Sequence, residues 1–159
     1  MRELIWSASC SALLSTTTFA TTLDCAQVDQ YTSNIGVTCQ TSKGIQFERI
    51  QDGKAGDMGW EDLKAGRIWF DSISDNLNWV AADNFCSNQL RSLPSDNDFE
   101  IATIHGFLEI LRDMRSRTLW SETTFEPVPH EILAIYFDGQ QADTDEDNPY
   151  SIHSAQCIE

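Results

Sequence analysis

The stretch that decides the fold is residues 78–99, which read NWVAADNFCSNQLRSLPSDNDF. Asn78 can cap a helix, because its side-chain oxygen can accept a bond from a free backbone amide of the first turn. From Trp79 to Cys86 the apolar residues recur at i, i+3, i+6 and i+7, which places them on one helical face. The sequence therefore predicts a short helix that directs Cys86 into the core.

A second helix start follows within the same stretch. Pro94 ends an extended segment, and Ser95 lies three residues before Asp98, the spacing of a capping box with Asp in place of Glu. We expect this helix to turn Phe99 and Ala102 inward and to be interrupted at Gly106. Apolar residues between 107 and 114 predict a further helical turn or two.

The segments on the N-terminal side of these helices have the texture of strands. Residues 34–50 predict a hairpin, because apolar residues alternate with small or polar ones on either side of the turn Ser42-Lys43-Gly44. The turn Lys64-Ala65-Gly66 separates Trp60 from the apolar run at 68–70. That run predicts a strand that is buried on both faces.

The segments on the C-terminal side predict strands again, at 118–120, 132–137 and 151–158. The acidic stretch 140–148 is expected to be a long solvated loop before the closing strand. The order of strands, helices and strands predicts an α+β domain, which we place at 21–159.

The first twenty residues predict export. The run from Leu4 to Ala20 has no charged residue and ends in Thr18-Phe19-Ala20, with small residues at the positions that signal peptidase accepts. The run is also too short, and too rich in Ser and Thr, to be a permanent membrane span. We therefore predict a signal peptide at 1–20, with a buried N-terminal helix as the alternative, and no membrane span in the mature form.

The charge excludes some classes of partner. The formal net charge is −15 at pH 7, and it stays so when Arg2 and Glu3 leave with the signal. Such a surface repels phosphate backbones and anionic membranes. Nucleic acid and lipid are therefore unexpected partners, whereas cations and basic surfaces remain open.

The cysteine count supports an oxidising compartment. Cys10 leaves with the signal, and the remaining four, Cys25, Cys39, Cys86 and Cys157, form an even set that allows three connectivities. No Cys-x-x-Cys spacing is present, so a zinc site has little support.

A family resemblance is carried by a series of short blocks. These are Gly66-Arg67-Ile68-Trp69, Asn84-Phe85-Cys86, Arg91-Ser92-Leu93-Pro94-Ser95, Trp120-Ser121 and Ala155-Gln156-Cys157-Ile158. In their order and spacing they resemble the Lcl C-terminal domain family of secreted bacterial proteins, many of unknown function. Ser92 and Gln156 stand where the family has basic residues.

The resemblance implies a C-type-lectin-like fold, related to that of formylglycine-generating enzymes. It implies small antiparallel sheets, two short helices and two disulfides, with an N-terminal hairpin region at 25–50 and the family-like core at 60–159. It also implies that a helix cysteine pairs with one on the last strand, which selects Cys86–Cys157 and leaves Cys25–Cys39.

Acidic and aromatic residues between 120 and 150 are the candidate binding residues. Calcium prefers oxygen ligands, and Asp143, Asp145, Glu146 and Asp147 offer them, although their spacing is not that of an EF-hand. The Glu-Pro-Asn and Trp-Asn-Asp motifs of calcium-dependent lectins are missing. We expect no cofactor unless calcium binds there. For a protein or glycan ligand the candidates are Trp120, Glu122, Glu126 and Asp138.

The leading functional hypothesis is a secreted, periplasmic or cell-surface recognition or adhesion module that binds through loops at 121–150. The Trp residues have core packing as their simpler role. A catalyst is not expected, because the chain has no Gly-x-Ser-x-Gly elbow and two disulfides leave no free cysteine. The alternatives are a structural or accessory subunit of a surface assembly and a small extracytoplasmic hydrolase.

Overall fold

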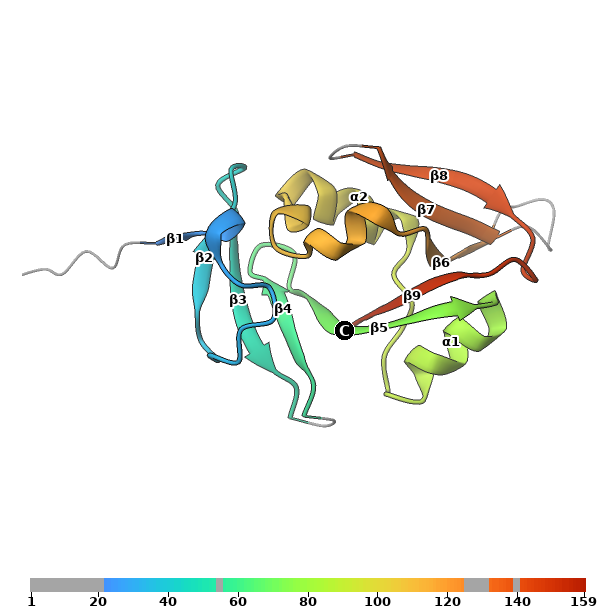
Figure 1. The fold of residues 1–159 in the computed structure, drawn as a ribbon, viewed down its shortest axis with the longest axis horizontal. Helices are drawn as coiled ribbons and strands as arrows, with labels where there is room; N and C mark the ends of the chain where they lie inside the picture. Colours follow the sequence, from blue (N-terminus) through green and yellow to red (C-terminus); the bar gives the residue numbers. More distant parts are fainter. Residues whose placement is uncertain (1–21, 54–55, 125–131, 139–140) are drawn as a thin grey trace, which may run out of the picture.

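The described part of the chain folds around one mixed β-sheet. The computed structural model describes residues 22–53, 56–124, 132–138 and 141–159. Nine strands lie in the order β1-β2-β3-β4-β5-β9-β6-β7-β8, and α1 and α2 pack on opposite sides of the sheet (Figure 1). This confirms the α+β prediction. The predicted signal peptide at 1–20 lies outside the described residues.

The strands and helices have the following bounds. The strands are β1 (Leu23–Asp24), β2 (Thr38–Gln40), β3 (Gln46–Gln51), β4 (Met58–Asp62), β5 (Arg67–Leu77), β6 (Leu119–Thr124), β7 (Ile132–Asp138), β8 (Gln141–Asp147) and β9 (His153–Ile158). The α-helices are α1 (Trp79–Ser87) and α2 (Asp96–His105), and the 3-10 helices are η1 (Cys25–Gln27), η2 (Phe107–Glu109) and η3 (Arg112–Ser116).

The N-terminal strands form an antiparallel meander from β2 to β5. The predicted turn at Gly44 joins β2 to β3, and Gly44 takes a φ of 79°, a left-handed conformation that favours glycine. The predicted turn before Gly66 joins β4 to β5. The hairpin prediction was wrong at its start, because β2 begins at Thr38 and Ile35 is exposed.

Both helices begin where the sequence predicts. The side chain of Asn78 accepts a bond from the amide of Ala81 and caps α1. Ser95 and Asp98 form the capping box of α2. That helix ends at Gly106, whose φ of 84° is left-handed, and the chain continues as η2 and η3. These capped ends fix where the helices sit against the sheet.

The central strands are buried on both faces. In β6 Leu119 faces the core layer under α2, and the next residue, Trp120, faces the layer under α1. In β7 Ile135 faces the layer under α2, and Ala134 faces the layer under α1. Because successive side chains of a strand point to opposite faces, a strand between two helical layers needs apolar residues at neighbouring positions.

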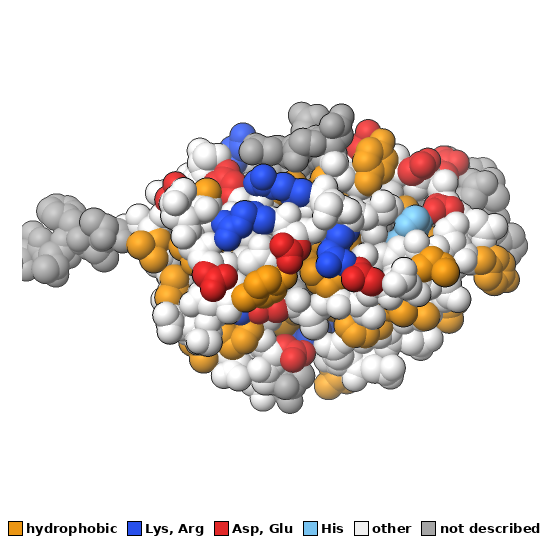
Figure 2. Space-filling model, in the orientation of Figure 1, with side chains coloured by type: hydrophobic (Ala, Val, Ile, Leu, Met, Phe, Trp, Pro, Cys, Tyr) orange, Lys and Arg blue, Asp and Glu red, His pale blue; other side chains and the backbone are white. Residues whose placement is uncertain are grey.

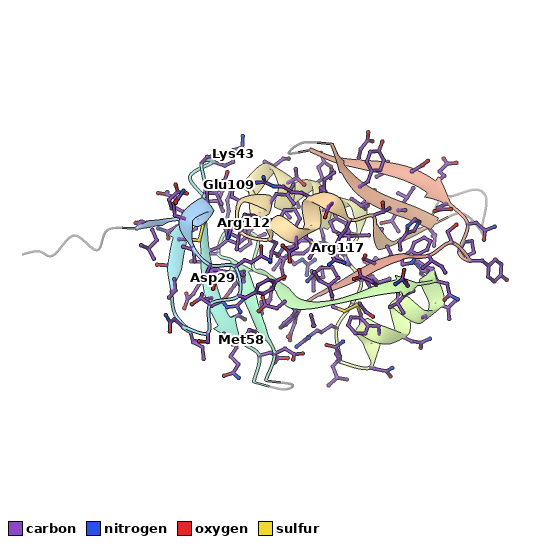
Figure 3. All side chains as sticks on the ribbon, in the orientation of Figure 1. Asp29, Lys43, Met58, Glu109, Arg112 and Arg117 are labelled. Atoms are coloured by element: carbon purple, nitrogen blue, oxygen red, sulfur yellow. A yellow bond between two sulfur atoms is a disulfide. The ribbon has the colours of Figure 1, made fainter. Side chains whose placement is uncertain are left out.

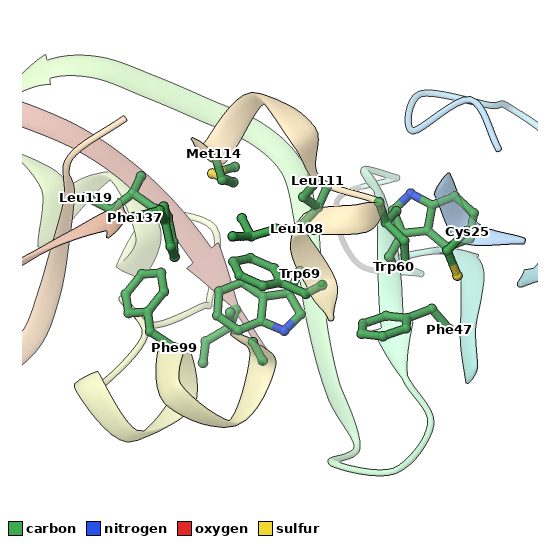
Figure 4. Close-up of a cluster of buried hydrophobic side chains, with 14 of the residues drawn as sticks. Cys25, Phe47, Trp60, Trp69, Phe99, Leu108, Leu111, Met114, Leu119 and Phe137 are labelled. Carbon is green, nitrogen blue, oxygen red and sulfur yellow. The ribbon is translucent and has the colours of Figure 1, made fainter. Parts of the chain in front are cut away.

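The layer under α2 is rich in aromatic side chains (Figure 4). The ring of Trp69 lies 5.5 Å from that of Phe99 and 4.9 Å from that of Phe107. Trp69 and the neighbouring Phe70 are both buried, which confirms the prediction of a strand buried on both faces. Burial of side chains of this size contributes about 1.5–3 kcal/mol each.

Two disulfides close the fold, and both have the predicted pairing. Cys25 is joined to Cys39, and Cys86 of α1 is joined to Cys157 of β9. Disulfides of this kind persist in oxidising, extracytoplasmic compartments. Within the described ranges, no helix has the length and apolar character needed to cross a membrane.

Two predictions about the strands were wrong. The acidic stretch 140–148 is largely the strand β8, which pairs with β7 over seven residues, rather than a long loop. The expected small antiparallel sheets are one sheet in which β1–β2 and β6–β9 pair in parallel. An edge strand tolerates charged residues because one side of it faces solvent.

Candidate functional site

Trp120, a predicted ligand-binding residue, is part of the core. Its side chain has no exposed surface, and its indole Nε1 donates to the carbonyl of Leu77 at 2.7 Å. The ring of His153 packs edge-on against it at 4.5 Å. In this arrangement Trp120 offers no face on which an external ligand could stack. Core packing, the simpler role expected of the Trp residues, is confirmed for it, and its alternative assignment as a ligand-binding residue is corrected.

Two of the other predicted binding residues lie on β6 and β7. Glu122 is exposed on β6, and its pKa is raised by partial burial and by the nearby charge of Asp98, an effect that Arg67 partly offsets. Asp138 is the last residue of β7. Glu126 lies outside the described residues.

The acidic residues of β8 have different neighbours along the strand. Asp143 accepts a hydrogen bond from the hydroxyl of Tyr136 at 3.0 Å. Asp147 is 2.5 Å from Nε2 of His153 and accepts a bond from Ser151 at 2.6 Å. Burial alone would raise the pKa of Asp147, but these bonds and one from the amide of Asn148 outweigh it and lower the pKa.

The predicted calcium residues are not brought together as one ligand set. Asp143 and Asp147 make the separate contacts given above, and Asp145 and Glu146 line a groove. Over the described ranges, no three His, Cys, Asp or Glu side chains converge in a group that could hold a metal ion. Calcium binding therefore has no support from the arrangement of these four residues.

The groove beside β8, which we call the acidic groove, has a volume of about 610 Å³. Its described lining holds three carboxylates, three threonines and one leucine, and no lysine or arginine; the residues are Asp96, Thr123, Thr124, Leu133, Thr144, Asp145 and Glu146. They come from the start of α2 and from β6, β7 and β8. Figure 2 shows acidic side chains over β8 on the face in view.

Hydrogen bonds hold one wall of the acidic groove in place. The hydroxyl of Thr123 donates to the carboxylate of Asp96 at 2.9 Å and accepts from the Asp96 amide at 3.1 Å. This exchange ties the first residue of α2 to β6. The wall of the groove is therefore formed before any ligand arrives, which lowers the ordering cost of binding.

Several residues of the acidic groove were missed at the level of sequence. Asp145 and Glu146 were named as calcium ligands, whereas Asp96 was assigned to a helix start and Leu133 to a strand. The three threonines of the lining belong to no sequence motif that indicates a binding site. They meet because β6, β7 and β8 are neighbours in the sheet and α2 begins beside β6, and local sequence patterns do not specify this arrangement.

Other carboxylates of the chain are each paired with a buried arginine or histidine, and we call them the paired carboxylates. Arg91, whose side chain is fully buried, contacts two of them at 2.8 and 2.9 Å, Arg49 contacts a third, and His105 lies 2.5 Å from a fourth. The two contacted by Arg91 are Asp52 and Asp57, the one contacted by Arg49 is Asp71, and the one beside His105 is Asp62. The guanidinium of Arg91 also lies 3.3 Å from the ring centroid of Phe70.

A second cleft, of about 490 Å³, lies where β5 ends and β9 begins. It contains His153, which is paired with Asp147. Among the described residues no hydroxyl bonds to this imidazole, because the nearby Ser154 donates to Asp75 at 2.6 Å instead. The histidine, carboxylate and hydroxyl needed for an activated nucleophile are therefore not in line here.

No family model, no curated protein and no solved structure matches this chain.

Proposed function

We propose that this protein is an extracytoplasmic recognition module whose acidic groove binds a basic segment of a partner protein. The observation that carries the proposal is the lining of the groove, where Asp96, Asp145 and Glu146 occur with no lysine or arginine among the described lining residues. A surface hollow of one sign of charge focuses the field on an incoming ligand of the opposite sign.

The remaining groove residues fit an extended basic chain. Lysine and arginine carry long apolar stems behind their charges, and such stems pack on apolar side chains such as Leu133. The hydroxyls of Thr124 and Thr144 can accept bonds from ammonium or guanidinium groups and from peptide amides. The lining therefore offers acceptors for the charges and a place for the stems.

The net charge of the whole chain acts in the same direction. At −15 it attracts basic partners over a distance of about one Debye length, roughly 8 Å at physiological ionic strength. This attraction raises the association rate more than it raises affinity. Selectivity between basic partners then depends on contacts inside the acidic groove.

The groove can be tested by amide NMR on the disulfide-bonded protein titrated with an oligolysine peptide. We expect shifts concentrated at Thr123, Thr124 and Thr144, with affinity falling as salt rises. An oligoglutamate peptide of equal length is the matched control and should cause none. Shifts spread evenly over the acidic surface would contradict the proposal, because they would show attraction without a site.

We also propose that the fold is C-type-lectin-like and related to the Lcl C-terminal domain family. The support is the disulfide from Cys86 on α1 to Cys157 on the last strand, together with the blocks that the sequence shares with the family. An experimental structure compared with lectin-like domains tests this. A different strand connection around β9 would contradict it.

For location, we propose a secreted, periplasmic or cell-surface protein released by cleavage after Ala20. The two disulfides support an oxidising compartment. The mass and N-terminal sequence of the exported product test the cleavage site. An intact N-terminus on the exported protein would contradict it.

A further inference from the structure

We propose that the second cleft, at the end of β5, is a binding site for a neutral saccharide, distinct from the acidic groove. The cleft lies between the end of β5, the residues that follow η3 and the start of β9. Arg117, one of its lining residues, is labelled in Figure 3 and directly follows η3. The inference goes beyond the proposed protein partner and does not depend on it.

Each ionisable side chain that lines the cleft already has a partner. Arg117 pairs with Asp75, and His153 pairs with Asp147 at 2.5 Å. A ligand with a net charge would meet a group that is already compensated, and it would have to displace an existing partner to gain a full ion pair. The pairing therefore favours a ligand without net charge.

The rest of the lining mixes hydrogen-bond donors with acceptors. Hydroxyls come from Ser116, Thr118 and Ser154, and an amide comes from Asn76. One apolar side chain, Ile152, joins them. A sugar hydroxyl is donor and acceptor at once, so a chain of such groups can satisfy a mixed lining that an apolar ligand would leave unpaired.

The polar groups are held in position before a ligand binds. The hydroxyl of Ser154 donates to Asp75 at 2.6 Å and lies 3.4 Å from Nη1 of Arg117. Asn76 takes a φ of 59°, a left-handed conformation that asparagine tolerates better than most residues and that is enriched at ligand sites. A site ordered in this way loses little entropy on binding.

Apolar surface stands close to the cleft along the chain. The side chain of Ile152 is 60% exposed and that of Tyr150 is 82% exposed. Carbohydrate rings present C–H faces that pack on apolar and aromatic surfaces, while their hydroxyls point outward to polar groups. The polar lining of the cleft together with the exposed side chain of Ile152 matches both sides of a sugar ring.

The test is an amide NMR titration of the disulfide-bonded protein with methyl glucoside, methyl mannoside, methyl galactoside and methyl glucuronide. Because the cleft is open and polar, we expect weak binding, with a Kd of the order of millimolar, by at least one neutral glycoside. The shifts should fall at 116–118 and 152–154. The charged glucuronide should bind no better than the glucoside.

Two conservative variants locate the site. Asn76→Asp keeps a side chain that tolerates the left-handed backbone but removes the amide donor, and Thr118→Val removes one hydroxyl at equal size. Each should weaken binding of the neutral glycoside about tenfold, the effect of one lost hydrogen bond. Thr144→Val, in the acidic groove, is the matched control and should leave it unchanged.

The inference is overturned by any of three results. These are no titratable shift with any of the four glycosides, tighter binding of the glucuronide than of the glucoside, and shifts that persist unchanged in both cleft variants. The spectra of the variants away from the cleft report on folding. Failure of this titration leaves the oligolysine titration unaffected, because that one is observed at the acidic groove.

Discussion

Carboxylates have opposite surroundings in the two ends of the sheet. The paired carboxylates, in and around β3, β4 and β5, contact a buried arginine or histidine. Those of the acidic groove, at β8 and the start of α2, gather on a surface where the described lining has no lysine or arginine. The difference teaches that the first set stabilises the fold, whereas we propose that the second meets a cation from outside.

The largest effect should come from removing Arg91. In Arg91→Met a side chain of similar volume is kept, but the buried guanidinium that contacts Asp52 and Asp57 is removed. Breaking one side of a buried ion pair costs about 3–5 kcal/mol, and denaturant unfolding measures the loss.

A double variant checks the cause of that loss. Adding Asp52→Asn to Arg91→Met removes one of the two carboxylate charges that Arg91 contacts and should recover part of the free energy of unfolding. If Arg91→Met alone lowers the free energy of unfolding by less than about 1 kcal/mol, the ion pairs of the paired carboxylates do not stabilise the fold. The distinction between the two ends of the sheet would then fail.

A smaller effect is expected at Asp62. Its Oδ1 accepts bonds from the amides of Lys64 and Ala65 in the turn, and its Oδ2 lies 2.5 Å from Nδ1 of His105. Asp62→Ala leaves these groups unsatisfied and should cost about 1–3 kcal/mol in thermal or denaturant unfolding. Asp62→Asn keeps an acceptor for the turn, so an equal loss in both variants would contradict this explanation.

Asp147 lies between the two classes and should show the smallest effect on stability. Its pKa is lowered, so its stabilisation is fully present above the ordinary value of 3.8 and is lost as pH falls through the lowered pKa. Thermal melts across this acid range should show that loss in the native protein and not in Asp147→Asn. Identical pH dependence in both proteins would show that the contacts of Asp147 contribute nothing to stability.

Much of the fold followed from local patterns, and the site did not. Asn78 and Ser95 marked helix starts because a cap is decided by a few neighbouring residues. The strand β8 was missed because aspartate and glutamate have low strand propensity, and pairing with β7 overrides that preference. The burial of Trp120 could not be predicted from its neighbours in the sequence, because it depends on the strands that flank β6 in the sheet.

The buried ion pairs show the same limit. Arg91 and Asp52 are separated by 39 positions, and no spacing rule connects residues so far apart. The resemblance to the Lcl C-terminal domain family did predict one long-range contact, the pairing of Cys86 with Cys157. The acidic groove needed the order of strands in space, which neither pattern nor resemblance provided.

The most direct test compares two pairs of substitutions that remove equal charge. The variant Asp145→Asn with Glu146→Gln removes two of the three negative charges that line the acidic groove. The variant Asp29→Asn with Asp83→Asn removes two exposed negative charges elsewhere. Both should change the free energy of unfolding by less than about 0.5 kcal/mol. For oligolysine binding measured by calorimetry, we predict about tenfold weakening in the groove variant and little change in the other. Equal weakening in both would contradict the account, because net charge alone would then explain the binding.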